Sequence, residues 1–220
     1  MHMKQKSFLL AALFASSVIV GINASMAVDT NADAATRNTC LCNKKFLHLH
    51  DKFRKLWEDH IQWTRNYIIS AIANLADQGP VAQRLLQNQV DLGDAIKPYF
   101  GKKVGNKLTE LFTDHILIAV DVIADAIANN IPQYNIDYAR WQKNARRIAE
   151  FLHKHNPHWS KEEFKKMLYE HLDLTACEVS SRLQSDWQAD INCYDEGHTH
   201  ALKIADMFTN GIVKEFPGKF

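Results

Sequence analysis

Apolar side chains recur every three or four residues along most of the chain, a spacing that places them on one face of an α-helix. No segment alternates apolar and polar residues in the two-residue manner of a strand. Glycine and proline, which interrupt helices, number only 8 and 5. The pattern therefore predicts an all-α protein.

Turn-forming residues divide this pattern into five predicted helices, four of them long. "DQGP" at 77–80 and "NNIP" at 129–132 are breaks, and Ser160 with Glu163 has the spacing of a helix-capping pair. A short helical piece at 81–89 leads to a turn-rich stretch around Gly93. The predicted helices cover about 44–76, 102–130, 135–154, 160–183 and 186–215.

These elements suggest a helical bundle. If the chain reverses at every predicted break, the first and last helices run one way, and the second and fourth run the other. The third helix then serves as a crossover. We predict a four-helix bundle with one extra crossover helix, in an up-down topology similar to that of ferritin-like bundles.

The N-terminus has the pattern of an export signal. Lys4 and Lys6 precede the apolar run "FLLAALFASSVIVGI", and "ASMA" ends in the small residues Ser25 and Ala27. The run is too short to span a bilayer comfortably. We therefore predict a signal peptide over 1–27, a flexible mature N-terminus over 28–43 and one bundle domain over 44–217. Localisation would be periplasmic, cell-surface or secreted.

Charge excludes one class of partner. The chain has 26 basic and 25 acidic side chains, and the leader holds two lysines and no acid, so the mature protein has a net charge of −1. Nucleic-acid binding needs a basic excess or a basic stripe, and neither is present. No transmembrane segment is predicted after the leader, and the sequence identifies no protein partner.

Three similar segments place a histidine within an apolar helix stripe. They read "LWEDHIQWT" (56–64), "LFTDHILIA" (111–119) and "MLYEHLDLT" (167–175). Each has an acid before the histidine and Ile or Leu after it. At a rise of about 1.5 Å per residue, all three histidines fall near the middle of the predicted bundle. These are His60, His115 and His171.

The last predicted helix adds two further candidates at this level. His171 lies 14 residues before Ser185 and His198 lies 13 after it, which makes them level across an antiparallel turn. Asp195 stands three residues before His198, on the same face. Imidazoles with a carboxylate suit a transition metal, namely Zn, Fe, Mn, Cu or Ni. The alternative is a hydrogen-bonded polar layer without metal, because unpartnered polar groups are costly in a core.

Other cofactor types have weaker support. The chain contains no C-x-x-C-H for covalent haem attachment, although two histidines could still hold a haem. Di-iron bundles use Glu-x-x-His twice, and none of the four candidate histidines has a glutamate at that spacing.

Four cysteines lie after the leader. Cys177 and Cys193 stand eight residues before and eight after Ser185, in compatible directions, so a disulfide between them is predicted, against an alternative of two buried thiols. Cys40 and Cys42 could bind a soft metal, pair with another chain or do neither.

Residues 50–217 resemble a family of small, functionally uncharacterised bacterial helical-bundle proteins. The likeness rests on the three histidine segments together with "LLQN" (85–88) and "ADMFTNGIVKEF" (205–216). By this resemblance His60, His115, His171 and Asp195 match recurring positions, and His198 replaces a usual acid. Some members carry a glycosyltransferase label, but this helical sequence shows no nucleotide-sugar fold.

We therefore predict an exported bacterial helical-bundle protein that binds a transition metal through His60, His115, His171, Asp195 and His198. The alternative is a secreted or surface interaction protein, antigen-like and non-catalytic, whose histidines are structural. No catalytic residue is predicted, because no motif for an activated nucleophile is present.

Overall fold

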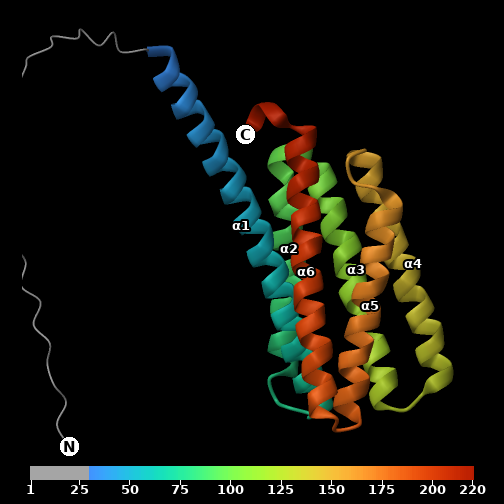
Figure 1. Cartoon of the computed structure of the whole chain (residues 1–220). Coiled ribbons are helices and arrows are strands. Elements are labelled where there is room, and N and C mark those ends of the chain that lie inside the picture. Colours follow the sequence, from blue (N-terminus) through green and yellow to red (C-terminus); the bar gives the residue numbers. More distant parts are fainter. Residues whose placement is uncertain (1–29) are drawn as a thin grey trace, which may run out of the picture.

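The computed structural model describes residues 30–220, with side chains from Lys44 onward. This part of the chain is helical, as predicted (Figure 1). The predicted leader, 1–27, and the side chains of Cys40 and Cys42 lie outside the described residues. The elements are α1 (Thr30–Ile72), α2 (Gln78–Phe100), α3 (Lys102–Ile127), α4 (Ile131–His155), α5 (Lys161–Leu183), α6 (Trp187–Glu215) and the short 3-10 helix η1 (Pro217–Lys219).

The predicted number of helices is wrong because α2 is one full-length helix. Gly93, read as part of a turn, is buried inside it, and Pro98 stands in its last turn. The helix ends at Gly101, whose φ of 83° suits glycine. The first helix also begins earlier than predicted, at Thr30, so most of the 28–43 segment has helical backbone.

The sequence identifies the N-terminal cap of α5 correctly but not that of α6. Ser160 caps α5 by accepting a hydrogen bond from the backbone N–H of Glu163, as predicted. The cap of α6 is Asp186, which accepts from the backbone N–H of Ala189. Ser185, which stands three residues before Gln188 and so has the spacing of a cap in the sequence, instead takes the left-handed turn conformation with a φ of 58°.

The six helices form three antiparallel hairpins arranged in a ring. Each helix packs against its neighbours in the chain, and α6 returns to pack against α1. Helices α1, α3 and α5 run in one direction and α2, α4 and α6 in the other (Figure 1). The first three also contact one another, and each of the others packs between two of them. A helical bundle is confirmed, but α4 is the second helix of a hairpin and not a crossover within a four-helix bundle.

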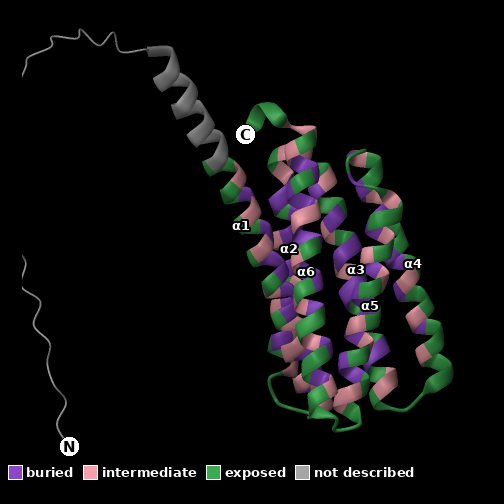
Figure 2. Cartoon of the chain, in the orientation of Figure 1, coloured by how far each residue is buried: buried purple, intermediate pink, exposed green. Residues whose placement is uncertain are grey.

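The three hairpins repeat one another at a spacing of 55 or 56 residues. The turns within the hairpins contain left-handed residues at Asn74, Asn129 and Ser185, with φ of 51°, 52° and 58°. Positions at the same spacing are buried alike. Every helix of the bundle carries buried residues (Figure 2). Examples of buried sets are Phe53, Leu108 and Phe164; Ile68, Ile123 and Val179; and Leu92, Ile148 and Ile204.

A hydrogen bond between the two helices recurs in every hairpin. A buried side chain on the second helix donates to a backbone carbonyl on the first, which ties the pair at mid-height. The three bonds are Asn88 Nδ2 to Leu56 O at 2.9 Å, Asn144 Nδ2 to Leu111 O at 3.1 Å and His200 Nε2 to Met167 O at 2.8 Å. The protein is thus an internal three-fold repeat of a helical hairpin.

Helices α2 and α3 meet backbone to backbone at Gly93 and Gly105. A Cβ atom on Gly93 would stand 2.7 Å from the carbonyl oxygen of Gly105 and would collide with the Thr109 side chain. We expect Gly93→Ala to lower the free energy of unfolding by about 1–3 kcal/mol, because the helices must separate.

Urea denaturation followed by circular dichroism measures this effect. Gly79→Ala is the matched control in the same helix, since a Cβ there meets nothing within 4 Å. It should leave stability unchanged or raise it by up to about 1 kcal/mol. Equal effects of the two substitutions would contradict the proposed close contact.

None of the helices in the described part of the chain is both long enough and apolar enough to cross a bilayer.

Candidate functional site

The three predicted histidines of the apolar stripes meet at the centre of the bundle. His60, His115 and His171 stand twelve residues before Ile72, Ile127 and Leu183, the last residues of three parallel helices. They are therefore level. The His60 and His171 ring centroids are 5.4 Å apart, and those of His115 and His171 are 6.5 Å apart. All three side chains are buried. We call them the histidine layer.

Amide side chains of the neighbouring helices contact two of these rings. His115 Nδ1 lies 2.8 Å from Asn144 Oδ1, so it donates there and its Nε2 carries the lone pair. Beside His60, Gln89 Nε2 lies 3.3 Å from the ring Nδ1 and donates at 3.2 Å to Oδ1 of Asn88, the residue equivalent to Asn144 in the first hairpin.

The third ring lacks such a partner. In the third hairpin the asparagine position is occupied by His200, whose Nε2 bonds the backbone. Among the described residues, His171 Nδ1 is buried without a hydrogen-bond partner. An orphaned polar atom in a core costs about 1–3 kcal/mol, so it marks a place where a partner would be stabilising.

Burial keeps the histidine layer neutral. Desolvation lowers the pKa of His60 to about 3, with a further contribution from the His115 charge, and lowers the pKa of His115 to about 4. Desolvation also lowers the pKa of His171 well below its ordinary value, and the charges of His60, His115 and His200 act in the same direction. Neutral imidazole is the form that binds metal ions.

A cavity of about 20 Å³ lies among the three rings, with Trp141 and Thr175 also in its wall. Trp57 packs edge-on against the His60 and His171 rings, and Trp141 packs on His115. This space suits a single water molecule or ion. As the side chains lie, no three or more His, Cys, Asp or Glu residues between 44 and 220 form a closed ligand set.

The structure does not bring Asp195 and His198 to this layer. Asp195 is exposed on α6. The His198 side chain is 37% exposed, and its Nε2 lies 3.7 Å from a carboxylate oxygen of Glu58. The level of a residue follows from its distance to a turn, but its direction depends on which face of α6 packs inward. That face carries Gly197 and Ala201.

Sequence reasoning missed His200, which is 3% exposed. The missed signal was its spacing of 56 residues from Asn144 and 112 from Asn88, which makes it part of the three-fold repeat.

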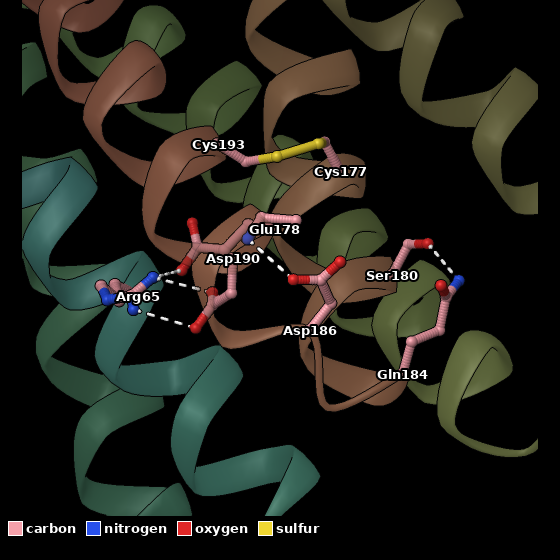
Figure 3. The surroundings of a disulfide bond; sticks show 9 residues. Arg65, Cys177, Glu178, Ser180, Gln184, Asp186, Asp190 and Cys193 are labelled. Atoms are coloured by element: carbon pink, nitrogen blue, oxygen red, sulfur yellow. Dashed lines mark hydrogen bonds and ion pairs between the residues drawn. A yellow bond between two sulfur atoms is a disulfide. The ribbon is translucent and has the colours of Figure 1, made fainter.

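The predicted disulfide is present between Cys177 and Cys193, whose Cα atoms are 5.9 Å apart (Figure 3). It links α5 to α6 near their shared turn.

A buried ion network lies beside the disulfide (Figure 3). Arg65 of α1 donates to Glu178 of α5 at 2.7 Å and to Asp190 of α6 at 3.0 Å and 3.1 Å. Arg182 also donates to Asp190, at 2.9 Å. Burial raises the pKa of Glu178 to about 7, opposed by the charge and hydrogen bond of Arg65. The network binds three helices together.

Comparison with models of protein families, with curated proteins and with solved structures finds no match to this chain.

Proposed function

We propose that this protein is an exported helical bundle that binds one transition-metal ion through His60, His115 and His171. The observation that carries the proposal is the convergence of three buried, neutral imidazoles from three parallel helices around one small cavity.

The ring separations support this. When ring nitrogens bind a metal at about 2 Å, the centres of neighbouring rings stand roughly 5–5.5 Å apart. The His60–His171 separation of 5.4 Å lies in this range, and the 6.5 Å of His115–His171 is about 1 Å longer. Binding through all three rings therefore requires side-chain adjustment that brings His115 closer to the other two. Three imidazoles favour Zn, Cu, Ni, Fe or Mn over Mg or Ca.

The hydrogen bond between Asn144 and His115 supports the metal site further. A histidine that binds a metal commonly donates its other ring N–H to an acceptor, which fixes the ring orientation. Asn144 accepts from His115 in this way. His171 lacks such an acceptor within the described structure, and coordination would stabilise that ring instead.

Export is supported by two independent features. The leader pattern of 1–27 is typical of a signal peptide, and a disulfide such as Cys177–Cys193 persists in oxidising compartments. The periplasm, the cell surface and the medium all meet this condition.

The competing function is a non-catalytic interaction protein in which the histidine layer only fixes helix pairing. The recurring side-chain-to-carbonyl bonds of Asn88, Asn144 and His200 favour it, because they hold each hairpin in register without a metal. The two functions differ in one measurable property, the metal content of the folded protein.

Metal content and affinity test the proposal. After chelator treatment, the mature protein should take up about one equivalent of Zn²⁺ or Co²⁺ at neutral pH, and Co²⁺ should show the visible absorption of a low-coordinate site. His115→Gln should weaken binding at least about tenfold, since it removes one of three ligands. Bound metal should also raise the melting temperature, because it binds only the folded state.

His198→Gln and Asp195→Asn are the matched controls on α6, and both should retain binding. If Zn²⁺, Co²⁺, Cu²⁺, Ni²⁺, Fe²⁺ and Mn²⁺ all fail to bind, the histidine layer is structural. Loss of binding in His198→Gln with retention in His115→Gln would move the site to the surface of α6.

A further inference from the structure

A cleft of about 450 Å³ opens between α3, α4 and α5, near the end of the bundle that carries the α3–α4 turn. In Figure 1, α4 and α5 diverge toward this end. Its walls include Val122, Ala126, Ala176 and Val179, and the Trp141 ring contributes to its floor. Trp141 also borders the cavity of the histidine layer, so the cleft reaches inward to the bundle centre.

The three-fold repeat places an equivalent groove between α5, α6 and α1, and there the space is filled. It holds the ion network of Arg65, Glu178, Arg182 and Asp190. At the repeat spacing, these four charged residues stand where the open cleft has Ala176, Val122, Ala126 and Tyr134, in that order.

The groove of the first hairpin, between α1, α2 and α3, holds a second uncharged hollow of about 410 Å³, and two of its lining side chains are hydrogen-bonded to each other. Gln78 Nε2 donates to the Tyr67 hydroxyl at 3.3 Å, and these residues occupy the positions of Tyr134 and Val122. Uncharged residues, three of the four being Ala or Val, thus leave the second groove open where the third groove has two arginines and two carboxylates.

The uncharged lining of the cleft favours an uncharged ligand. None of its lining residues is charged, and its few polar groups, such as Asn129, Tyr134 and Gln184, lie among aliphatic side chains. Two large apolar residues of its lining, Ile131 and Leu183, are 54% and 38% exposed. A charged ligand would lose its hydration here without gaining an ion partner.

We propose that this cleft binds one neutral, mainly apolar small molecule. Its volume lies within the range of roughly 300–1,000 Å³ typical of small-molecule sites, which are mostly apolar with a few polar groups. The site is separate from the three histidine side chains, and it does not require metal.

The neutral fluorophore N-phenyl-1-naphthylamine provides the test, because its emission rises in apolar surroundings. The mature protein should bind about one equivalent. Ala176→Phe should weaken binding at least about tenfold by filling the cleft. The bundle should tolerate this change, since the repeat-equivalent positions carry Val120 and Arg65. Circular dichroism and melting temperature establish that the variant is folded.

Ala82→Tyr is the matched control in the groove of the first hairpin, where the equivalent positions carry Tyr138 and Tyr194. It should leave binding unchanged. Unlabelled 1-decanol should displace the probe, whereas decanoate should not, because the site offers no cation.

Three results would overturn the proposal. The first is binding that Ala176→Phe leaves intact or that Ala82→Tyr weakens equally. The second is displacement by decanoate as effective as that by 1-decanol. The third is probe binding that appears only with dimerisation, measured by light scattering, since the cleft would then be an interface between copies.

Discussion

Acidifying the metal-free protein from pH 6 to about pH 4.5 should lower its free energy of unfolding by about 4 kcal/mol. The folded-state pKa values of His60 and His115 are about 3 and 4, and that of His171 is also well below 6.5. Below pH 6.5 these three histidines therefore bind up to three protons in the unfolded chain that they do not bind in the folded chain. Each proton lowers stability by about 1.4 kcal/mol per pH unit as the pH falls.

Glu178 changes the free energy of unfolding with pH in the opposite direction. Its folded-state pKa of about 7 lies above the ordinary value of 4.5, so the folded protein binds one extra proton between these values. Stability from this group rises as the pH falls through that window. The net difference is about two protons, or about 2.7 kcal/mol per pH unit. Most domains have only 5–15 kcal/mol in total, so a loss of this size approaches acid unfolding.

Urea denaturation at pH 8, 6, 5.5, 5 and 4.5, in the presence of a chelator, measures this slope. His115→Gln should reduce this slope by about 1.4 kcal/mol per pH unit, because the variant has one histidine fewer that binds a proton only in the unfolded chain. Leu172→Ala is the control: Leu172 is fully buried next to His171 and does not titrate. It should lower stability equally at every pH. An unchanged slope in His115→Gln would show that the histidine layer does not govern acid stability.

Arg65→Ala should destabilise the protein by about 3–5 kcal/mol at neutral pH. The substitution leaves the Glu178 side chain, 7% exposed, without its cation, and removes two of the hydrogen bonds to Asp190, 2% exposed. An uncompensated charge in a core is strongly destabilising. Arg182 keeps its bond to Asp190, and Glu178 can take up a proton because its pKa is already about 7, so the loss should lie toward the lower end of this range.

Chemical denaturation of the purified variants tests this, with Arg54→Ala as the matched control on the same helix. Arg54 pairs with Asp206 at 2.7 Å, but these side chains are 39% and 33% exposed, so its loss should amount to no more than about 1 kcal/mol. The double variant Arg65→Met, Glu178→Met should recover much of the loss, because it removes both charges. If Arg65→Ala behaves like Arg54→Ala, the network contributes little to stability.

Local sequence patterns were enough to predict most of the helices and several residue positions in this protein. The three- and four-residue apolar spacing predicted the helices, and Ser160 predicted the start of α5, because caps and amphipathic faces depend on residues close in sequence. The levels of His60, His115 and His171 also followed from counting residues. Cys177 and Cys193 were predictable as a pair because they lie on one hairpin.

Other features depended on packing between distant helices. Gly93 resembles a turn residue in the sequence, yet it lies inside α2, at a point where the backbone of α3 approaches closely. Because α2 is one full-length helix, every later helix runs opposite to its predicted direction. The inward face of α6 was likewise set by its contacts with α5 and α1, which bury His200 and leave Asp195 exposed.

The histidine layer and the cleft show which features follow from local sequence and which depend on packing between distant helices. The sequence by itself determined which residues are helical and which histidines lie on apolar stripes, since both depend on neighbours within a few turns. Only the tertiary structure decided that three hairpins close into a ring, because that requires complementary surfaces on helices far apart in the chain. The ring brings the histidines together, fills one groove with ions and leaves its equivalent between α3, α4 and α5 open.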